Sequence, residues 1–547
     1  MKRRWIEWLD VLAILCLWAA ALALIHPRGN FPLDDDWDFA LATWRFAKSG
    51  HFQFSQFTAM SLRAQVLWGA LWTRLFGQSF EVLRSSTLLL SAGTIALVHR
   101  TIGHAGGNRM ACAAGALAIG FHPLFIWASC TYMTEGPFVF ASALALYFFV
   151  RAFTAQRSLF FFLGCAAVIL SWFVRQTGVT HAMAILALLL LLRGKITPHW
   201  RSWAIGASAL LILFTILLIF RRDWLSGAPV EFAAHFRMWR ESSFRLPQQM
   251  EVALDYGDFS ARYSALFFLP LVAPLSFFFP GRSDRTAWVV TAVAAIPLLV
   301  RAQSLLARGL PLPYYVSPYC CDIVPGAFID IGLGPIGLNT NFEYPFRLAF
   351  SGRVALTYLS VILGALLIGF LISIAARRRN VGIMISLSFA FFGSLGLLGH
   401  SLYVDRYVLD SAWPIAVALA LALPWEQARV RWCFAAVLLF VAMFDVAALH
   451  DYFTLNRARW RAVSELRARG IPVQKINGGP EVFAFYEMAY MDRHTQRRFI
   501  FGAPLRPYTI SFVPLDGYVI ESETPLRSWV TGGRGRILVL RAIGTSG

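Results

Sequence analysis

The sequence predicts an all-α polytopic membrane protein that carries a small α/β domain at its C-terminal end. Its 547 residues are 58% hydrophobic and only 14% charged, and the mean hydropathy is +0.58. Apolar runs of about the length of a membrane span recur about thirteen times along the chain. After residue 450 the pattern changes to short, mixed segments. A soluble protein with a large core does not have this composition.

The first apolar run, Val11 to Ile25, follows Met1-Lys2-Arg3-Arg4 and has the layout of a signal peptide. We interpret it as an uncleaved span, because no small-residue cleavage site precedes the acidic stretch that comes next. The same pattern then continues along the chain. Further apolar runs lie at residues 83–99, 110–128, 137–153, 159–174, 177–192, 203–220, 264–280, 286–302, 354–375, 381–402, 410–425 and 431–449.

Basic residues gather in alternate loops between these runs and predict the orientation. They lie at residues 99–109, 151–157, 193–201, 282–285, 377–379 and 429–431, on the side of the N-terminus. By the positive-inside rule this side is cytoplasmic, as in a bacterial inner membrane. The excess of Lys and Arg over Asp and Glu, 49 to 30, is therefore a topological signal and argues against nucleic-acid binding. We expect the first long loop, about residues 27–82, and the tail 451–547 on the external face.

The first external loop begins with four carboxylates within five residues: Asp34, Asp35, Asp36 and Asp38. Such a group is costly near a low-dielectric surface unless a positive charge or a proton compensates it. The alternatives are a solvated acidic loop, or a helix N-terminus whose dipole favours Asp in the first turn. Two amphipathic stretches follow, Ala40 to Lys48 and Arg63 to Phe76, and they predict helices lying in the membrane interface.

The tail after residue 450 has the pattern of a small α/β domain. Arg457 to Arg469 is a basic amphipathic helix pattern that stops at Gly470. Short strands are predicted at residues 471–476, 518–521 and 537–541, with Gly- and Pro-containing turns between them. We therefore divide the chain into a transmembrane domain, 1–450, and an external domain, 451–547.

Several short motifs, taken together, resemble a known family. Asp35-Asp36, followed by Phe39-Ala40 and closing at Ser49-Gly50, resembles the first external loop of the C-type (GT-C) glycosyltransferases. The resemblance is to the protein O-mannosyltransferase-like group, glycosyltransferase family 39, which includes the lipid A aminoarabinose transferase. It extends to Leu75-Phe76-Gly77 with Glu81 and Arg84, to Met133-Thr134-Glu135, and to Asp405-Arg406-Tyr407.

The sequence departs from the family pattern in two places. The family commonly has a Lys-Pro-Pro segment after the first loop, whereas this chain reads Thr58-Ala59-Met60-Ser61-Leu62-Arg63; Arg63 is the candidate for the missing positive charge. The run of acids also leaves the alignment open. Phe39 and Gly50 favour Asp35 as the family's first Asp, and a shift of one residue would nominate Asp34 or Asp36.

The resemblance implies a membrane enzyme that takes a sugar from a polyprenyl-phosphate donor on the external face. The implied acceptor is a cell-envelope lipid such as lipid A, a polysaccharide or a protein. The chain shows no Gly-rich phosphate-binding loop on the cytoplasmic side, which agrees with a donor that is not a nucleotide. Which sugar and which acceptor are used remains open.

The implied chemistry assigns roles to particular residues. An acceptor hydroxyl needs a carboxylate base, for which Asp35 is the candidate, while Asp36 tunes it or binds the acceptor. Glu135 would hold the sugar, the acceptor or a metal. The departing lipid phosphate needs fixed cations, and the external candidates are Arg63, Arg175 and Arg406. Asp34 and Tyr407 complete the substrate-binding set that the resemblance implies.

Each of these residues also has a purely structural explanation. Glu135 is also explained as a helix cap, Arg175 as an interfacial anchor, and Arg406 as a partner of Asp405 or Asp410.

The cysteines have no metal-ligand spacing; a divalent metal held by acids and one His stays open.

Two other functions compete. The first is an O-antigen polymerase or ligase, which would rely on external Arg and His. The second is a transporter, which would show internal halves and charges in mid-span, and the sequence shows neither.

Overall fold

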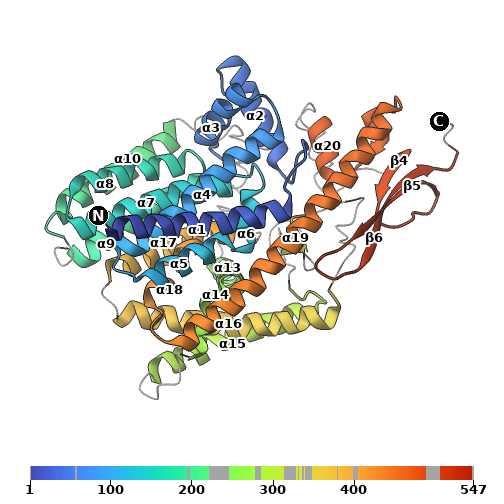
Figure 1. The fold of residues 1–547 in the computed structure, drawn as a ribbon. Coiled ribbons are helices and arrows are strands. Elements are labelled where there is room, and N and C mark those ends of the chain that lie inside the picture. Colours follow the sequence, from blue (N-terminus) through green and yellow to red (C-terminus); the bar gives the residue numbers. More distant parts are fainter. Residues whose placement is uncertain are drawn as a thin grey trace.

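The computed structural model describes most of the chain. The described residues are 2–55, 58, 60–193, 197–220, 246–277, 285–312, 328–329, 332–335, 338, 348–377, 380–397, 405–487 and 506–544. The predicted fold class is confirmed: the protein is mostly helical, with a small sheet domain near the C-terminus (Figure 1).

Seven helices are long and apolar enough to cross a membrane, within the part of the chain that the structure describes. They are α1 (Lys2–Ile25), α4 (Phe80–His104), α7 (Glu135–Ala155), α10 (Trp200–Phe220), α15 (Arg285–Ala307), α16 (Phe350–Arg377) and α19 (Ala428–Ala468). Two bent helix pairs would raise the number to nine. The protein is therefore a multi-pass membrane protein.

The two bent pairs break at proline residues. Helices α5 (Arg109–Gly120) and α6 (Pro123–Ser129) meet at 63°, and α13 (Leu246–Phe267) and α14 (Leu269–Val272), which continues into η3 (Ala273–Phe277), meet at 84°. Pro123 and Pro270 occupy the first turn of α6 and α14. A proline there suits the start of a helix but cannot continue the one before it, because it lacks the backbone N–H and restricts the residue that precedes it.

The expected number of about thirteen spans is not confirmed. Over its described residues every predicted apolar run coincides with helical structure, but four of these helices are too short to qualify as spans by themselves. They are α8 (Ser158–Trp172), α9 (Val179–Leu192), α17 (Val381–Leu397) and α18 (Arg406–Ala422). A helix of this length spans about 25 Å, somewhat less than the hydrocarbon thickness of a bilayer.

The loop between α1 and α4 contains the two helices that the sequence predicts. Helix α2 (Asp36–Ser49) ends at Gly50, whose φ of 73° is left-handed, and α3 (Arg63–Phe76) ends at Gly77. Both project from one end of the bundle (Figure 1). Helix α3 exposes a row of large apolar side chains, namely Leu67, Leu71, Leu75 and Phe76. Such a row is typical of a helix that rests on the membrane interface.

The C-terminal sheet follows α19 directly. Its strand order is β3-β4-β6-β5, with β3 (Ile476–Asn477) parallel to β4 (Tyr508–Ser511), and β5 (Tyr518–Arg527) and β6 (Arg534–Ala542) forming an antiparallel hairpin. The short η4 (Val473–Lys475) contacts β3, and helix α20 (Pro480–Tyr486), which follows β3 in the chain, contacts α2. The predicted boundary at residue 451 falls inside α19, which runs unbroken because no Gly or Pro occurs between Ala428 and Ala468.

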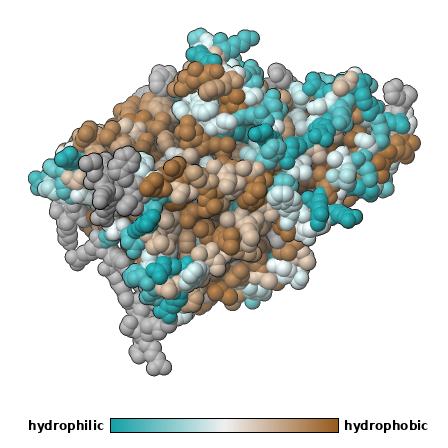
Figure 2. Space-filling view, in the orientation of Figure 1, coloured by the Kyte–Doolittle hydropathy of each residue, from teal (hydrophilic) through white to brown (hydrophobic). Residues whose placement is uncertain are grey.

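The surface agrees with a membrane setting. In Figure 2, hydrophobic residues cover most of the visible face of the helical bundle, and hydrophilic residues gather toward the far end of α19 and the sheet.

Three shorter elements complete the described fold: η1 (Gln176–Gly178) and the paired strands β1 (Phe328–Ile329) and β2 (Gly332–Leu333).

Candidate active site

The acidic loop is fastened to the start of α4. Arg84 is buried and donates to the carbonyl oxygen of Gly29 at 2.7 Å and to that of Phe31. Glu81 accepts from the backbone N–H of Gly29 at 2.7 Å, and Asn30 accepts from the N–H of Phe80 at 2.9 Å. The backbone that enters the four-acid stretch is therefore held from the side by α4 and is not a free surface loop.

Asp36 ties the loop to the turn before α7. It is fully buried, and its carboxylate accepts hydrogen bonds from the backbone N–H of Leu33 at 2.7 Å and of Tyr132 at 3.3 Å. Burial raises the pKa of Asp36 to about 7, although nearby Arg84 opposes the shift. Asp38 is buried as well and accepts from the hydroxyl of Thr58 at 2.6 Å; burial raises its pKa to about 6. These two acids hold the loop in place.

Asp34 and Asp35 instead face a guanidinium from the far end of the sequence. Arg406 is the first residue of α18. One of its guanidinium nitrogens donates a hydrogen bond to the Asp34 carboxylate, and the other donates one of 2.8 Å to the Asp35 carboxylate. Asp34 has a left-handed backbone with a φ of 53°, and Asp35 is the N-cap residue of α2. The Asp35 side chain keeps 55% of its surface exposed. It is thus the accessible carboxylate of the stretch.

A second guanidinium lies behind the first. Arg175, from the turn before η1, binds Asp410 at 2.5 Å and Glu135 at 3.3 Å, and all three side chains are buried. Glu135 also lies 3.7 Å from Nε of Arg406 and so joins the two arginines. The Tyr407 ring lies between them, with centroid distances of 5.1 Å to Arg175 and 5.8 Å to Arg406. We call Asp34, Asp35, Glu135, Asp410, Arg175 and Arg406 the acid–arginine cluster.

The acid–arginine cluster holds four carboxylates against two guanidinium groups. With all six groups charged it would carry two excess negative charges, so it has capacity for a proton or a cation. Oε2 of Glu135 and Oδ1 of Asp410 are buried without a hydrogen-bond partner. Buried polar atoms are normally paired, so two such oxygens at one place leave room for a water, an ion or a polar ligand. Among the described residues, no three His, Cys, Asp or Glu side chains are grouped so that they could hold a metal ion.

The structure brings most of the predicted site residues together. Asp34, Asp35, Glu135, Arg175, Arg406 and Tyr407 lie in or against the acid–arginine cluster. Asp36 lies next to it in the chain but is occupied by backbone N–H groups. Arg63 lies at the start of α3, with its guanidinium 4.7 Å from the ring centroid of Phe52 and 5.5 Å from that of Phe54.

Asp410 is the member of the cluster that sequence reasoning did not place in the site. It was considered only as a partner of Arg406, whereas the structure pairs it with Arg175. Its spacing was a usable signal, because Asp410 follows Arg406 by four residues and therefore shares its face of the helix.

Comparison with known proteins supports the predicted resemblance. Residues 67–220 match the family described as dolichyl-phosphate-mannose-protein mannosyltransferase. This segment includes Glu135 and Arg175. The predicted family resemblance is confirmed over this segment. No curated protein matches the sequence.

The solved structures that are similar to this chain share little sequence with it. The archaeal oligosaccharyltransferase AglB from Archaeoglobus fulgidus, in complex with an inhibitory peptide and a dolichol-phosphate, is 17% identical with a TM-score of 0.43; the match covers 85% of this chain. This chain spans 58% of the length of AglB. ArnT from Cupriavidus metallidurans is 13% identical in the apo state, with a TM-score of 0.39, covering 100% of this chain and 99% of ArnT. A second structure of ArnT, bound to undecaprenyl phosphate, matches with 14% identity and a TM-score of 0.37, and the match covers 100% of both chains.

Proposed function

We propose that this protein is a membrane glycosyltransferase that moves a sugar from a polyprenyl-phosphate donor to a cell-envelope acceptor. The observation that carries the proposal is the ion pair of exposed Asp35 with Arg406, backed by Glu135 and Arg175. It places an accessible carboxylate beside two guanidinium groups at one end of the helices. A sugar transfer from a lipid phosphate needs this combination of a base and fixed cations.

The two arginines would receive the phosphate of the donor, together with the proton or cation that the excess of carboxylates in the cluster requires. Guanidinium groups bind phosphate oxygens through paired N–H donors. In the resting arrangement Arg406 is occupied by Asp34 and Asp35. A donor phosphate that engages Arg406 would compete with Asp35 for the same N–H groups, and the carboxylate would be released toward the acceptor.

The released Asp35 would act as the general base. The acceptor oxygen attacks the anomeric carbon, its proton passes to Asp35, and the bond between that carbon and the phosphate oxygen breaks. The polyprenyl phosphate leaves with the bonding electron pair and stays on the arginines. Asp34, Glu135 and Asp410 would hold Arg406 and Arg175 in place while the phosphate charge develops. If the acceptor is itself a phosphate, it needs no base, and Asp35 would orient the sugar.

The expected cellular setting is also part of the proposal. The basic loops predict a bacterial inner membrane with the N-terminus in the cytoplasm. The acid–arginine cluster, the α2–α3 loop and the C-terminal sheet would then lie on the external side. The acceptor would be lipid A, a polysaccharide or a protein exposed there.

The test is transfer of radiolabelled sugar from polyprenyl-phosphate donors to envelope fractions. Membranes would contain the wild type, Asp35→Asn, or Asp516→Asn, a control at an exposed turn of the sheet domain. We expect transfer with the wild type and the control and its loss with Asp35→Asn at equal protein levels. Failure of the wild type with a panel of hexose- and pentose-linked donors would overturn the proposed function.

A further inference from the structure

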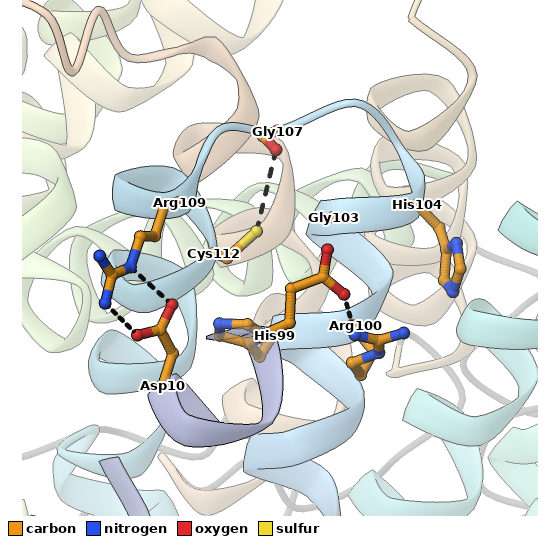
Figure 3. A pocket seen from close by; sticks show the side chains of 9 residues that line it. Asp10, His99, Arg100, Gly103, His104, Gly107, Arg109 and Cys112 are labelled. Atoms are coloured by element: carbon orange, nitrogen blue, oxygen red, sulfur yellow. Dashed lines mark hydrogen bonds and ion pairs between the residues drawn. The ribbon is translucent and has the colours of Figure 1, made fainter. Parts of the chain in front are cut away.

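A second polar site lies at the opposite ends of the helices that carry the candidate active site. A cavity of about 330 Å³ is lined by residues from α1, α4 and the start of α5 (Figure 3). Arg84 near the start of α4 holds the acidic loop, whereas Arg100 near its end lines this cavity. Their separation of sixteen positions corresponds to roughly 24 Å of helix. The cavity is therefore distinct from the acid–arginine cluster.

Two ion pairs form the wall of this cavity. Arg109 binds both carboxylate oxygens of Asp10, at 2.7 and 2.5 Å, and Arg100 binds Glu7. Figure 3 shows His99 between the Asp10–Arg109 pair and Arg100. Two acids and two guanidinium groups make the lining electrically balanced. A balanced lining suits a ligand that carries one charge of each sign better than a simple anion or cation.

His99 has hydrogen-bonding capacity that the protein leaves unused. Its side chain is only 3% exposed, and neither ring nitrogen has a hydrogen-bond partner. An imidazole offers at least one donor, and a buried polar group without a partner is costly. Nε2 of His104 is in the same condition. These unpaired ring nitrogens, in addition to the two ion pairs, indicate that the cavity holds a polar ligand.

The position of the cavity identifies the source of the ligand. The apolar run of α1 begins directly after Asp10, and α4 ends at His104. Both residues line the cavity, which therefore lies at the level where the hydrocarbon layer meets the lipid headgroups. Its volume is at the lower end of the range for small-molecule sites and fits a headgroup rather than a whole lipid.

We propose that this cavity binds the zwitterionic aminoalkyl-phosphate headgroup of a membrane lipid, of the phosphatidylethanolamine type. The phosphate would accept hydrogen bonds from His99, Arg100 and Arg109. The ammonium group, with three N–H donors, would bind Asp10 and Glu7. A trimethylated headgroup has no N–H to donate and would bind more weakly. The proposal concerns a site separate from sugar transfer and does not rest on the proposed function.

The test is native mass spectrometry of the full-length protein, purified in detergent and stripped of lipid. The probes are the dihexanoyl forms of phosphatidylethanolamine, phosphatidylglycerol and phosphatidylcholine, with soluble glycerophosphoethanolamine as a fourth arm. We expect one phosphatidylethanolamine to bind at least about tenfold more tightly than each other probe, the ratio expected from hydrogen bonds to charged groups. Equal binding of phosphatidylglycerol would overturn the proposal. If glycerophosphoethanolamine, which has no acyl chains, binds as tightly as phosphatidylethanolamine, the inference that the ligand is a membrane lipid is wrong.

Three variants separate recognition from folding. Arg109 is 71% exposed, so Arg109→Gln leaves the packed interior alone and is expected to weaken phosphatidylethanolamine binding about tenfold. His99→Phe keeps the ring and removes both nitrogens, with the same expectation. Asp10→Asn leaves an excess positive charge and is expected to shift the preference toward phosphatidylglycerol. The matched control is Arg429→Gln, an exposed arginine at the start of α19 outside this cavity. Wild-type binding by both Arg109→Gln and His99→Phe would overturn the site.

Discussion

Arg406 donates a hydrogen bond of 2.8 Å to Asp35, which lies 371 residues earlier in the chain. The contact joins the N-terminus of α18 to the N-cap of α2, and the same guanidinium also contacts Asp34 and Glu135. The Arg406 side chain therefore connects three segments of the candidate active site that are far apart in the sequence.

Removing Arg406 is expected to affect both binding and stability. Arg406→Gln would leave Asp34, Asp35 and Glu135 facing one another without their shared cation. Loss of the partner of a partly buried charge costs about 1.5–3 kcal/mol, so the melting temperature should fall. Affinity for a polyprenyl phosphate should fall by at least about tenfold, since the phosphate loses a guanidinium fork. Titration with a fluorescent polyprenyl phosphate measures the second effect, with Arg429→Gln as control. Unchanged affinity in Arg406→Gln would show that the phosphate binds elsewhere.

The buried acids predict how stability depends on pH. The pKa values of Asp36 and Asp38 are raised to about 7 and about 6 by burial, from an ordinary value of about 4. The folded protein therefore keeps protons that the unfolded chain has released, and the free energy of unfolding falls as the pH rises from about 4 to about 7. Asp36→Asn cannot ionise, so its decline over this window should be shallower. Melting temperatures of both proteins at several pH values test this; parallel curves would contradict it.

A close approach between α3 and the turn before α7 predicts a rescue experiment. Gly69 faces Tyr132 so closely that an added Cβ would lie 2.0 Å from the tyrosine hydroxyl oxygen. The same hydroxyl donates to the carbonyl oxygen of Gln65 at 3.0 Å. Gly69→Ala should therefore cost about 1–3 kcal/mol of overpacking. Tyr132→Phe removes the closest clashing atom and leaves only Tyr132 Cζ and Thr43 Cγ2 at 2.9 Å. The loss of stability in the double variant should therefore be smaller than the sum of the two single losses. Strict additivity in thermal unfolding would show that the two segments do not pack in this way.

The junction of α19 with the sheet domain depends on Asp451. Its carboxylate accepts from the hydroxyl of Ser528 at 2.6 Å and from the N–H of Trp529 at 2.9 Å, while His450 stacks on the Trp529 ring at 3.6 Å. Asp451→Ala would leave these donors without a partner, at a cost of about 1–3 kcal/mol. We expect faster proteolysis at the turn around residues 528–533. Cleavage at the wild-type rate would indicate that the hairpin is held by other contacts.

The sequence predicts the helices better than it predicts the contacts between them. Apolar runs and the caps at Gly50 and Gly77 are local signals, so α2, α3 and the buried helices lie where they were expected. The positive-inside rule placed Glu135, Arg175 and Arg406 at one end of the bundle, and the structure brings them together. The number of spans could not be predicted, because hydropathy shows neither the exact length of each helix nor how far a helix bends at a proline.

The pairing inside the cluster could not be predicted either. Four adjacent acids look alike in sequence, yet Asp36 binds backbone N–H groups while Asp35 remains exposed. The difference arises from the direction in which α2 leaves the loop, which depends on packing against α4 and the Tyr132 turn. Asp410 likewise binds Arg175 rather than Arg406, because of how α18 packs against the turn before η1.

The most direct test of the central claim is the turnover rate of purified Asp35→Asn at saturating donor and acceptor. The Asp35 side chain is more than half exposed and Arg406 keeps Asp34 as a partner, so the substitution should leave the fold intact and lower the melting temperature only slightly. If Asp35 is the base at the acid–arginine cluster, turnover should fall by about 10²–10⁴-fold, while Asp516→Asn stays at the wild-type rate. Turnover of Asp35→Asn within about twofold of the wild type would contradict the account.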